Sequence, residues 1–132
     1  MSKIKVLFVD DSWDFAQLYK HFIDGEEDMV FVGALASADR LVDTVQNVSP
    51  DVVVLDLRMP GRDPLEVLRD LSSKGCDTKV LLFSGLISEE LRLEGAEAGA
   101  WGLIAKDEEP EAVLKAIRRV AAGEMVFSSH QR

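Results

Sequence analysis

The sequence predicts an α/β fold in which one parallel sheet is covered by helices on both faces. Five strand-like runs alternate with five helix-like stretches along the chain. Two of the runs, residues 52–55 and 80–83, are apolar throughout, as expected of parallel strands whose two faces are both buried. The length of 132 residues suits a single domain. We therefore expect a doubly wound (βα)5 three-layer sandwich with right-handed crossovers.

The five strands are expected at residues 4–9, 29–35, 51–55, 79–83 and 101–105. The helices between them show apolar residues at helical spacing, such as Phe15, Leu18 and Phe22 in the first helix. The last helix is the best marked, because Pro110 fits its opening turn and Gly123 its end.

The stretch of residues 88–98 predicts the weakest helix. It has few apolar residues, it contains Gly95, and it carries four glutamates. A helix with little apolar anchorage shifts at low cost in free energy, so we expect this helix to be the moving part of the fold.

Composition excludes several classes of protein. With 15 basic and 24 acidic residues the formal net charge is -9, and a duplex phosphate backbone would be repelled, so we expect no direct nucleic-acid binding by this segment. No apolar run approaches the roughly 20 residues of a membrane-spanning helix, and the first residues show no signal-peptide cleavage pattern. We therefore expect a cytoplasmic protein without a membrane partner. The single cysteine, Cys76, excludes an internal disulfide.

Polar side chains lie at the ends of four predicted strands. The first strand is followed by Asp10 and Asp11, the third by Asp56, the fourth by Ser84 and the fifth by Lys106. In an open α/β sheet the ligand site lies outside the carboxyl ends of the strands. These five side chains are therefore expected to converge at one edge of the sheet.

Each of these residues also has a simpler structural role open to it. Asp10 or Asp11 could cap the first helix, and Asp56 could enter a turn. Ser84 could cap the helix that follows it, and Lys106 could be an ordinary solvated lysine. Those roles require a separate coincidence at four strand ends, whereas one chemistry accounts for all of them.

That chemistry is phosphoryl transfer with a metal ion. Three carboxylates in one crevice repel one another and raise one another's pKa. Mg²⁺ removes this conflict, because it binds through carboxylates and leaves positions for a phosphate. A carboxylate such as Asp56 can attack phosphorus and hold the group as an aspartyl phosphate, which needs positioning and charge neutralisation. Lys106 and Ser84 could then contact the phosphoryl oxygens.

Four segments resemble a known family: Val-Asp-Asp at 9–11, Val-Leu-Asp-Leu-Arg-Met-Pro-Gly at 54–61, Leu-Phe-Ser-Gly at 82–85 and Gly-Leu-Ile-Ala-Lys at 102–106. Together they resemble the receiver domains of two-component response regulators. The resemblance implies a flavodoxin-like fold with strand order 2-1-3-4-5. It places a receiver domain at residues 1–124, and residues 125–132 would be a C-terminal tail or the start of a linker to an output domain.

The resemblance also assigns roles by position. Asp56 matches the phosphoacceptor, Ser84 the switch hydroxyl and Lys106 the phosphate-binding lysine. The Mg²⁺ ligands would be Asp10, Asp11, Asp56 and the backbone carbonyl of Arg58. The phosphoryl donor would be a sensor histidine kinase. The domain itself would be a signalling acceptor that assists its own phosphoryl transfer and autodephosphorylation, and not an enzyme acting on other substrates.

Residues 106–124 resemble receivers of the NarL/FixJ type, in which a DNA-binding domain normally follows. An output in transcription is therefore implied. The alternative is a stand-alone receiver that acts through protein contacts or as a phosphorelay intermediate. A homodimer on phosphorylation is typical of the family, and here the acidic fourth helix could pair with Lys115, Arg118 and Arg119 of the last. The chain departs from the family at Leu103, where an aromatic side chain usually reports phosphorylation.

Two other classes of function fit the sequence less well. A phosphatase of the haloacid dehalogenase type needs a second aspartate two residues after the nucleophile, where this chain has Arg58. A flavodoxin-like module that binds FMN needs a first loop that cradles a phosphate, whereas the loop at residues 10–14 is acidic.

Overall fold

The computed structural model describes residues 2–127, in which strands and helices alternate. The elements in chain order are β1 (Ile4–Val9), α1 (Trp13–Asp24), β2 (Met29–Leu35), the 3-10 turn η1 (Ala38–Arg40), α2 (Leu41–Val48), β3 (Val52–Asp56), α3 (Pro64–Ser73), β4 (Lys79–Ser84), α4 (Glu89–Ala98), β5 (Gly102–Ala105), α5 (Pro110–Ala121) and β6 (Val126–Phe127). The bounds of the five predicted strands differ from those observed by at most one residue.

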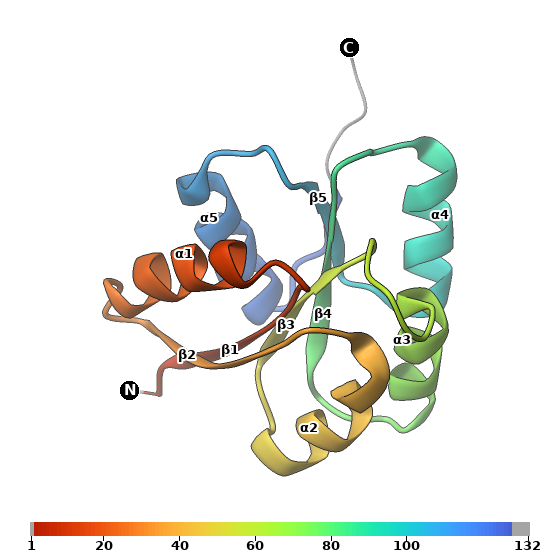
Figure 1. The fold of residues 1–132 in the computed structure, drawn as a ribbon, viewed down its shortest axis with the longest axis horizontal. Helices are drawn as coiled ribbons and strands as arrows, with labels where there is room; N and C mark the ends of the chain where they lie inside the picture. Colours follow the sequence, from red (N-terminus) through yellow and green to blue (C-terminus); the bar gives the residue numbers. More distant parts are fainter. Residues whose placement is uncertain (1, 128–132) are drawn as a thin grey trace.

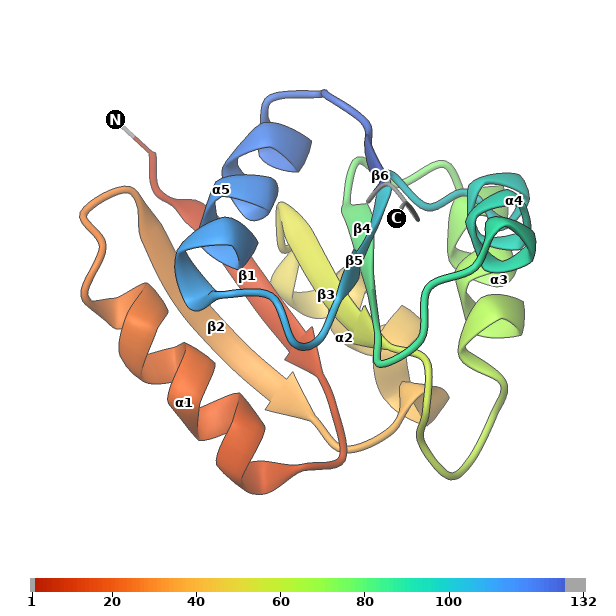
Figure 2. The same cartoon turned by 90° about the horizontal axis from the view of Figure 1, so that it is seen from above.

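The strands form one parallel sheet in the order β2-β1-β3-β4-β5-β6. The predicted order 2-1-3-4-5 is confirmed, and β6 extends the sheet beyond β5. Helices α1 and α5 cover one face, while α2, α3 and α4 cover the other (Figures 1 and 2). The described part of the chain contains no helix with both the length and the apolar character needed to cross a membrane.

Side chains that alternate along the strands divide the apolar interior into two cores. The α1–α5 core joins residues of the sheet to those two helices and includes Phe8, Tyr19, Phe83, Ile104, Val113 and Ile117. The α2–α4 core lies on the other face and includes Leu41, Leu55, Leu68, Leu82, Ala98 and Leu103. The sheet is therefore buried on both sides, which is why its central strands carry continuous apolar runs.

Side-chain caps explain where three of the helices begin. Ser12 accepts a hydrogen bond from the amide of Phe15 at 3.2 Å at the start of α1. Ser88 does the same for Leu91 at 3.1 Å at the start of α4, and Asp63 caps α3. Such a cap stabilises a helix by about 1 kcal/mol. Neither Asp10 nor Asp11 is therefore needed as the cap of α1, and Ser84 does not cap α4.

Helix α4 has the few buried residues that the sequence predicts, since only Gly95 and Ala98 are buried within it. Gly95 has a packing role as well. A Cβ atom at this position would lie 2.7 Å from Cδ1 of the buried Leu82, so the glycine lets the helix approach β4 closely. The helix is thus held by backbone proximity at its last turns, while its first turn relies on Leu91, which is partly buried.

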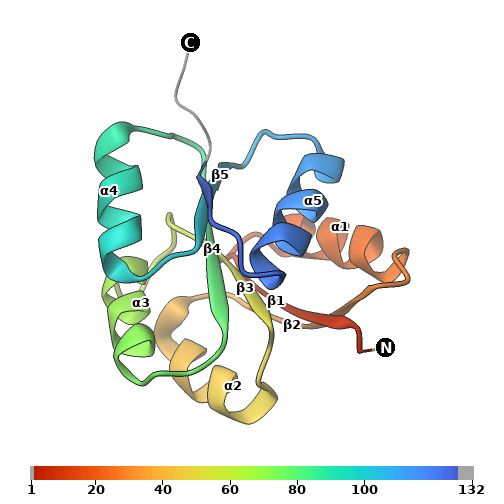
Figure 3. The ribbon, with the colours of Figure 1, turned by 180° about the vertical axis from the view of Figure 1, so that it is seen from behind.

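Strand β6 is the element that the sequence did not predict. Val126 and Phe127 pair in parallel with Gly102 and Leu103 of β5, on the open side of the sheet between α4 and α5 (Figure 3). Residues 125–132 are expected to be a tail or the start of a linker, and two residues of this segment, Val126 and Phe127, pair with the sheet. The rest of that segment, residues 128–132, lies outside the described residues.

The end of α5 is fixed to the α1–β2 connection by ion pairs. The Arg118 guanidinium bonds to Asp28 through Nε at 2.7 Å and Nη2 at 3.1 Å, and to Glu26 through Nη2 at 2.5 Å. Arg119 pairs with Glu124 at 3.0 Å. These two arginines therefore satisfy their charge within the chain.

We predict that Gly99→Ala lowers the free energy of unfolding by about 2–4 kcal/mol, measured by urea denaturation. Gly99 has a φ of +109°, and an added Cβ would collide with Ser72, whose hydroxyl donates to the Ala98 carbonyl at 3.0 Å. Gly75→Ala is the matched control, because its φ is +68° but no atom lies within 4 Å of the new Cβ. Equal losses in the two variants would contradict a role for the Ser72 contact.

We predict that Arg118→Met destabilises the fold at neutral pH by about 1 kcal/mol, because exposed pairs contribute about 0.2–1 kcal/mol each. The hydrogen bond from Arg118 holds the pKa of Asp28 below its ordinary value. A lowered folded-state pKa adds stability above the ordinary value, and this stability is lost as the pH falls through the folded value. Urea denaturation should therefore show a smaller difference in the free energy of unfolding between Arg118→Met and the wild type at pH 2.5 than at pH 7. Arg119→Met, which has one acidic partner, should cost less.

Candidate functional site

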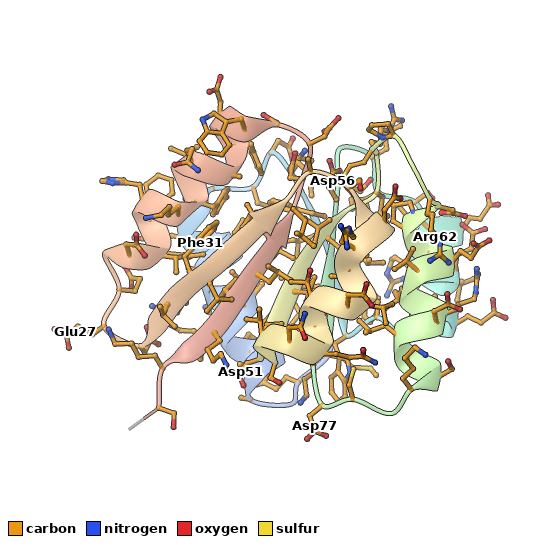
Figure 4. The ribbon with its side chains drawn as sticks, turned by 60° about the horizontal axis from the view of Figure 1, so that its bottom comes forward. Glu27, Phe31, Asp51, Asp56, Arg62 and Asp77 are labelled. Atoms are coloured by element: carbon orange, nitrogen blue, oxygen red, sulfur yellow. The ribbon has the colours of Figure 1, made fainter. Side chains whose placement is uncertain are left out.

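Three carboxylates gather at the carboxyl end of the sheet. Asp10, Asp11 and Asp56 each offer an oxygen, and these atoms lie within 4.8 Å of one another. Asp10 is 4% exposed and Asp56 is 2% exposed, whereas Asp11 faces solvent. Figure 4 shows Asp56 at this end of the sheet and Asp51 at the opposite end. The cluster predicted from the strand ends is therefore present.

Backbone amides orient the two buried carboxylates. Oδ1 of Asp10 accepts from the amide of Ser12 at 2.8 Å, and Oδ1 of Asp56 accepts from the amide of Arg58 at 3.1 Å. Each aspartate thus turns the chain at its strand end and directs its second oxygen, Oδ2, toward Lys106. The turn role considered for Asp56 exists alongside its place in the cluster.

The ammonium group of Lys106 lies between the two buried carboxylates. Its Nζ is 3.0 Å from Oδ2 of Asp10 and 3.4 Å from Oδ2 of Asp56. It also lies 4.6 Å from the centre of the Phe15 ring, which forms an apolar wall on this side. Burial lowers the pKa of Lys106, but hydrogen bonding and charge from Asp10, and then from Asp56, raise it above its ordinary value overall. Lys106 is therefore a charged partner of the cluster and not an ordinary solvated lysine.

The pKa of the Asp56 carboxyl is raised above its ordinary value. Burial raises the pKa of its carboxyl, and the nearby charge of Asp10 raises it further. The amide of Arg58 and the charge of Lys106 act in the other direction but do not cancel the rise. Any additional positive charge beside Asp56 would favour the ionised form of its carboxyl.

Ser84 reaches the same edge, but its hydroxyl is engaged elsewhere. The residue is 4% exposed, and its Oγ donates to the carbonyl of Leu86 at 2.7 Å and accepts from the Leu86 amide at 3.2 Å. The amide of Lys106 donates to the backbone carbonyl of Ser84 at 2.9 Å, which ties the ends of β4 and β5 together. The hydroxyl must leave Leu86 before it can contact a group on Asp56.

Two contacts of the site were not predicted from the sequence. Phe15 was read only as part of an apolar helical stripe, and its position under Lys106 depends on the packing of α1 against the sheet. The Leu86 backbone holds the Ser84 hydroxyl, and no side-chain signal marks a backbone partner. Arg58 lies next to the cluster through its backbone amide, which bonds to Asp56, and its side chain is exposed.

Trp101 does not replace the aromatic side chain that receiver domains usually have at the position of Leu103. Leu103 is fully buried in the α2–α4 core, whereas Trp101 packs partly against the α1–α5 core. Trp101 precedes β5 and lies near Nζ of Lys79, 5.2 Å from its ring centre, at the end of the strand away from the acidic cluster. It therefore cannot occupy the place of an aromatic side chain at position 103.

The acidic cluster fits a hard divalent cation. Its donors are carboxylate oxygens, two of them from nearly dry side chains that repel each other, and Mg²⁺ prefers this set. Cavity size does not mark the site, since a cavity of about 470 Å³ lies at the other end of the sheet beside Asp51, Cys76 and Asp77. A groove of about 290 Å³ lies next to Ser84, between Leu57 and Leu91.

Comparison with known proteins agrees with the geometry. Residues 6–118 match the family described as the response regulator receiver domain. The nitrate/nitrite response regulator NarL of Escherichia coli K12 is 35% identical over 123 residues, which cover 93% of this chain and 57% of that protein. The DNA-binding transcriptional activator DevR/DosR of Mycobacterium tuberculosis is 29% identical over 126 residues, which cover 96% of this chain and 58% of that protein. The chain thus spans a little over half the length of these relatives.

A solved structure gives the same result. The two-component response regulator of the LuxR family from Aurantimonas sp. SI85-9A1 superposes with a TM-score of 0.89 at 27% identity, covering 96% of this chain and 91% of that one. The predicted resemblance to receivers of NarL-type regulators is confirmed. With its parallel sheet, its acidic cluster and a family match over most of its length, this chain belongs to the response regulator receiver domains of two-component systems.

Proposed function

We propose that this receiver domain accepts a phosphoryl group on Asp56 with the help of Mg²⁺ and changes conformation in response. The observation that carries the proposal is the cluster of Asp10, Asp11 and Asp56 within 4.8 Å, with the ammonium of Lys106 bridging its two buried members. Structural ion pairs alone would not require three carboxylates at one point, whereas phosphoryl capture with a metal does.

The metal would be held by Asp10, Asp11, Asp56 and the backbone carbonyl of Arg58. When bound, Mg²⁺ would neutralise the negative charge that gathers between the carboxylates and the incoming phosphoryl group. The chain's own residues supply the positioning. The Ser12 and Arg58 amides fix the two buried carboxylates, and Phe15 limits water on the side of Lys106.

The proposed reaction is a transfer from a phosphohistidine of a sensor histidine kinase. One carboxylate oxygen of Asp56 forms a bond to phosphorus as the bond between phosphorus and the donor nitrogen breaks. The electron pair of that bond leaves with the imidazole ring, which carries a proton on its other nitrogen and departs neutral. Lys106 forms ion pairs with Asp10 and Asp56. On transfer it would give up part of this pairing and contact the phosphoryl oxygens instead.

The conformational response would begin at Ser84. A phosphoryl group adds about 1.5–2 negative charges, and each hydrogen bond to a charged group contributes about 1.5–3 kcal/mol. Contacts from Ser84 and Lys106 therefore supply a few kcal/mol, compared with about 5.5 kcal/mol for a complete two-state shift. Since Ser84 now bonds to Leu86, its turn toward Asp56 would release the loop into α4, whose first turn is weakly anchored.

The output is proposed to be transcription, through a domain outside this segment, because the similar DevR/DosR is a DNA-binding transcriptional activator of which the chain covers 58%. A homodimer on phosphorylation is part of the proposal. The charge pairing expected for it is less available than the sequence implies, because Arg118 and Arg119 pair with Glu26, Asp28 and Glu124 of the same chain. Of the three basic residues named for the dimer, Lys115 is exposed and has no ion pair among the described residues, so it would carry the pairing unless the arginines exchange partners.

We predict that Mg²⁺ stabilises the domain through the acidic cluster. At a concentration a hundred times the dissociation constant the gain is about 2.7 kcal/mol, or a rise in Tm of roughly 5–10 °C for a domain of this size. Asp11→Asn should remove most of the rise measured by differential scanning calorimetry. Asp14→Asn is the control, because Asp14 is an acidic residue of the first turn of α1 outside the cluster. An equal rise in Asp11→Asn would contradict the assignment.

We predict that incubation with Mg²⁺ and acetyl phosphate adds one phosphoryl group, detected by intact-mass spectrometry. Asp56→Asn should show no adduct, and Lys106→Met should form it more slowly by a factor on the order of 10². Asp77→Asn should behave as the wild type, because Asp77 is exposed at the opposite end of the sheet (Figure 4). A full adduct on the Asp56→Asn variant would overturn the proposed function.

A further inference from the structure

Strand β6 sits on an edge that is shaped to receive it. The amide of Val126 donates to the carbonyl of Trp101 at 2.9 Å. A Cβ atom at Gly102 would collide with the Val126 carbonyl and would lie 2.8 Å from Cδ1 of Leu81. Glycine at position 102 therefore permits the backbone of β6 to approach β5, and any other residue there would push it away.

The two residues of β6 face opposite layers of the molecule. Val126 packs against the α1–α5 core, while Phe127 packs against the α2–α4 core that contains Leu103. Phe127 is the register partner of Leu103 across the β5–β6 ladder. Phe127, from the segment after α5, therefore places an aromatic ring in the α2–α4 core beside Leu103.

The same core contacts the loop that Ser84 controls. Ile87 and Leu91, which follow the Ser84–Leu86 hydrogen bond into α4, are partly buried against the α2–α4 core, as is Phe127. Leu103 pairs with Leu82 on its other side, two residues before Ser84. The α2–α4 core therefore lies between the loop that follows Ser84 and Phe127, and it offers a packed route from one to the other.

We propose that β6 is a strap that docks on β5 while Ser84 is held by Leu86, and that phosphorylation of Asp56 loosens this docking. The inference rests on the proposed role of Asp56 as phosphoacceptor. In the structure the bond from Ser84 to Leu86 and the docked β6 occur together, and the proposal takes both as features of the unphosphorylated state. Through the contact between β5 and β6, the strap would pass the phosphorylation state of Asp56 to the residues that follow Phe127.

The coupling acts in both directions. Because the two equilibria are linked, occupation of the Asp56 site and release of β6 favour each other by the same factor, and a substitution that releases β6 fully should raise the affinity of the site by up to that factor. Beryllofluoride with Mg²⁺ is a reversible probe for this, since it adds to an aspartate as a phosphoryl group does without a covalent transfer. Trp13 is 71% exposed and lies two residues after Asp11, so its fluorescence is a suitable signal for titration.

The test measures both directions on the 132-residue chain. In the wild type, Mg²⁺ and beryllofluoride should speed amide hydrogen exchange at Val126, measured by NMR, by at least about fivefold. Phe127→Ala should bind beryllofluoride more tightly by a similar factor. Gly102→Ala displaces β6 by a different route and should act in the same direction. Met125→Ala is the matched control, since Met125 is 61% exposed in the same segment, and its affinity should equal that of the wild type.

The outcomes separate the two proposals. If beryllofluoride binds and acetyl phosphate gives an adduct, but Val126 exchange is unchanged and Phe127→Ala binds with wild-type affinity, the strap is wrong and the proposed function stands. Weaker binding by Phe127→Ala would reverse the sign and overturn the inference as stated. If neither reagent reacts with the wild type, the proposed function fails and the strap fails with it.

Discussion

The repulsion between Asp10 and Asp56 is the constraint on which the rest of the site depends. Both carboxylates are nearly dry, at 4% and 2% exposed, and both belong to adjacent parallel strands that end at the same edge. Within residues 2–127, the cation that pairs with these two carboxylates is the ammonium of Lys106. The site is therefore left short of positive charge, which is the condition under which a divalent cation and a charged reaction partner are taken up.

The frame around this site combines rigid and weakly held parts. The strands that carry Asp10, Asp56 and Ser84 are buried between two apolar cores, so the positions of these side chains are fixed by packing on both faces. Helix α4 and strand β6 have few buried apolar residues; α4 packs on β4 through Gly95, and β6 pairs with the first two residues of β5. Elements with few buried contacts open at low free energy. A change at the acidic cluster is therefore expected to move α4 and β6 more readily than the central strands.

The sequence was sufficient to predict that Asp10, Asp11, Asp56 and Lys106 lie at one edge of the sheet, because strand ends follow from hydrophobic patterning. The strand order came from the resemblance to receiver domains. It was not sufficient for the direction of the Ser84 hydroxyl, which depends on a rotamer and a backbone partner. Nor could it predict β6, since two residues are too few for a periodic pattern. Gly95 was read as a weakness in α4, whereas its closeness to Leu82 gives it a packing role that only the folded structure reveals.

The two borders of the sheet are protected in different ways. On the β2 side, the register with β1 shifts between Val6 and Leu7, and such an irregularity hinders pairing with another strand. On the other side, residues 102–105 of β5 are uncharged, and a bare strand of this kind would readily pair with a neighbouring molecule. Val126 and Phe127 of the same chain pair with the first half of that strand, at Gly102 and Leu103. Substitutions at Val126 or Phe127 would uncover these backbone groups, so the segment proposed to carry the signal also limits self-association.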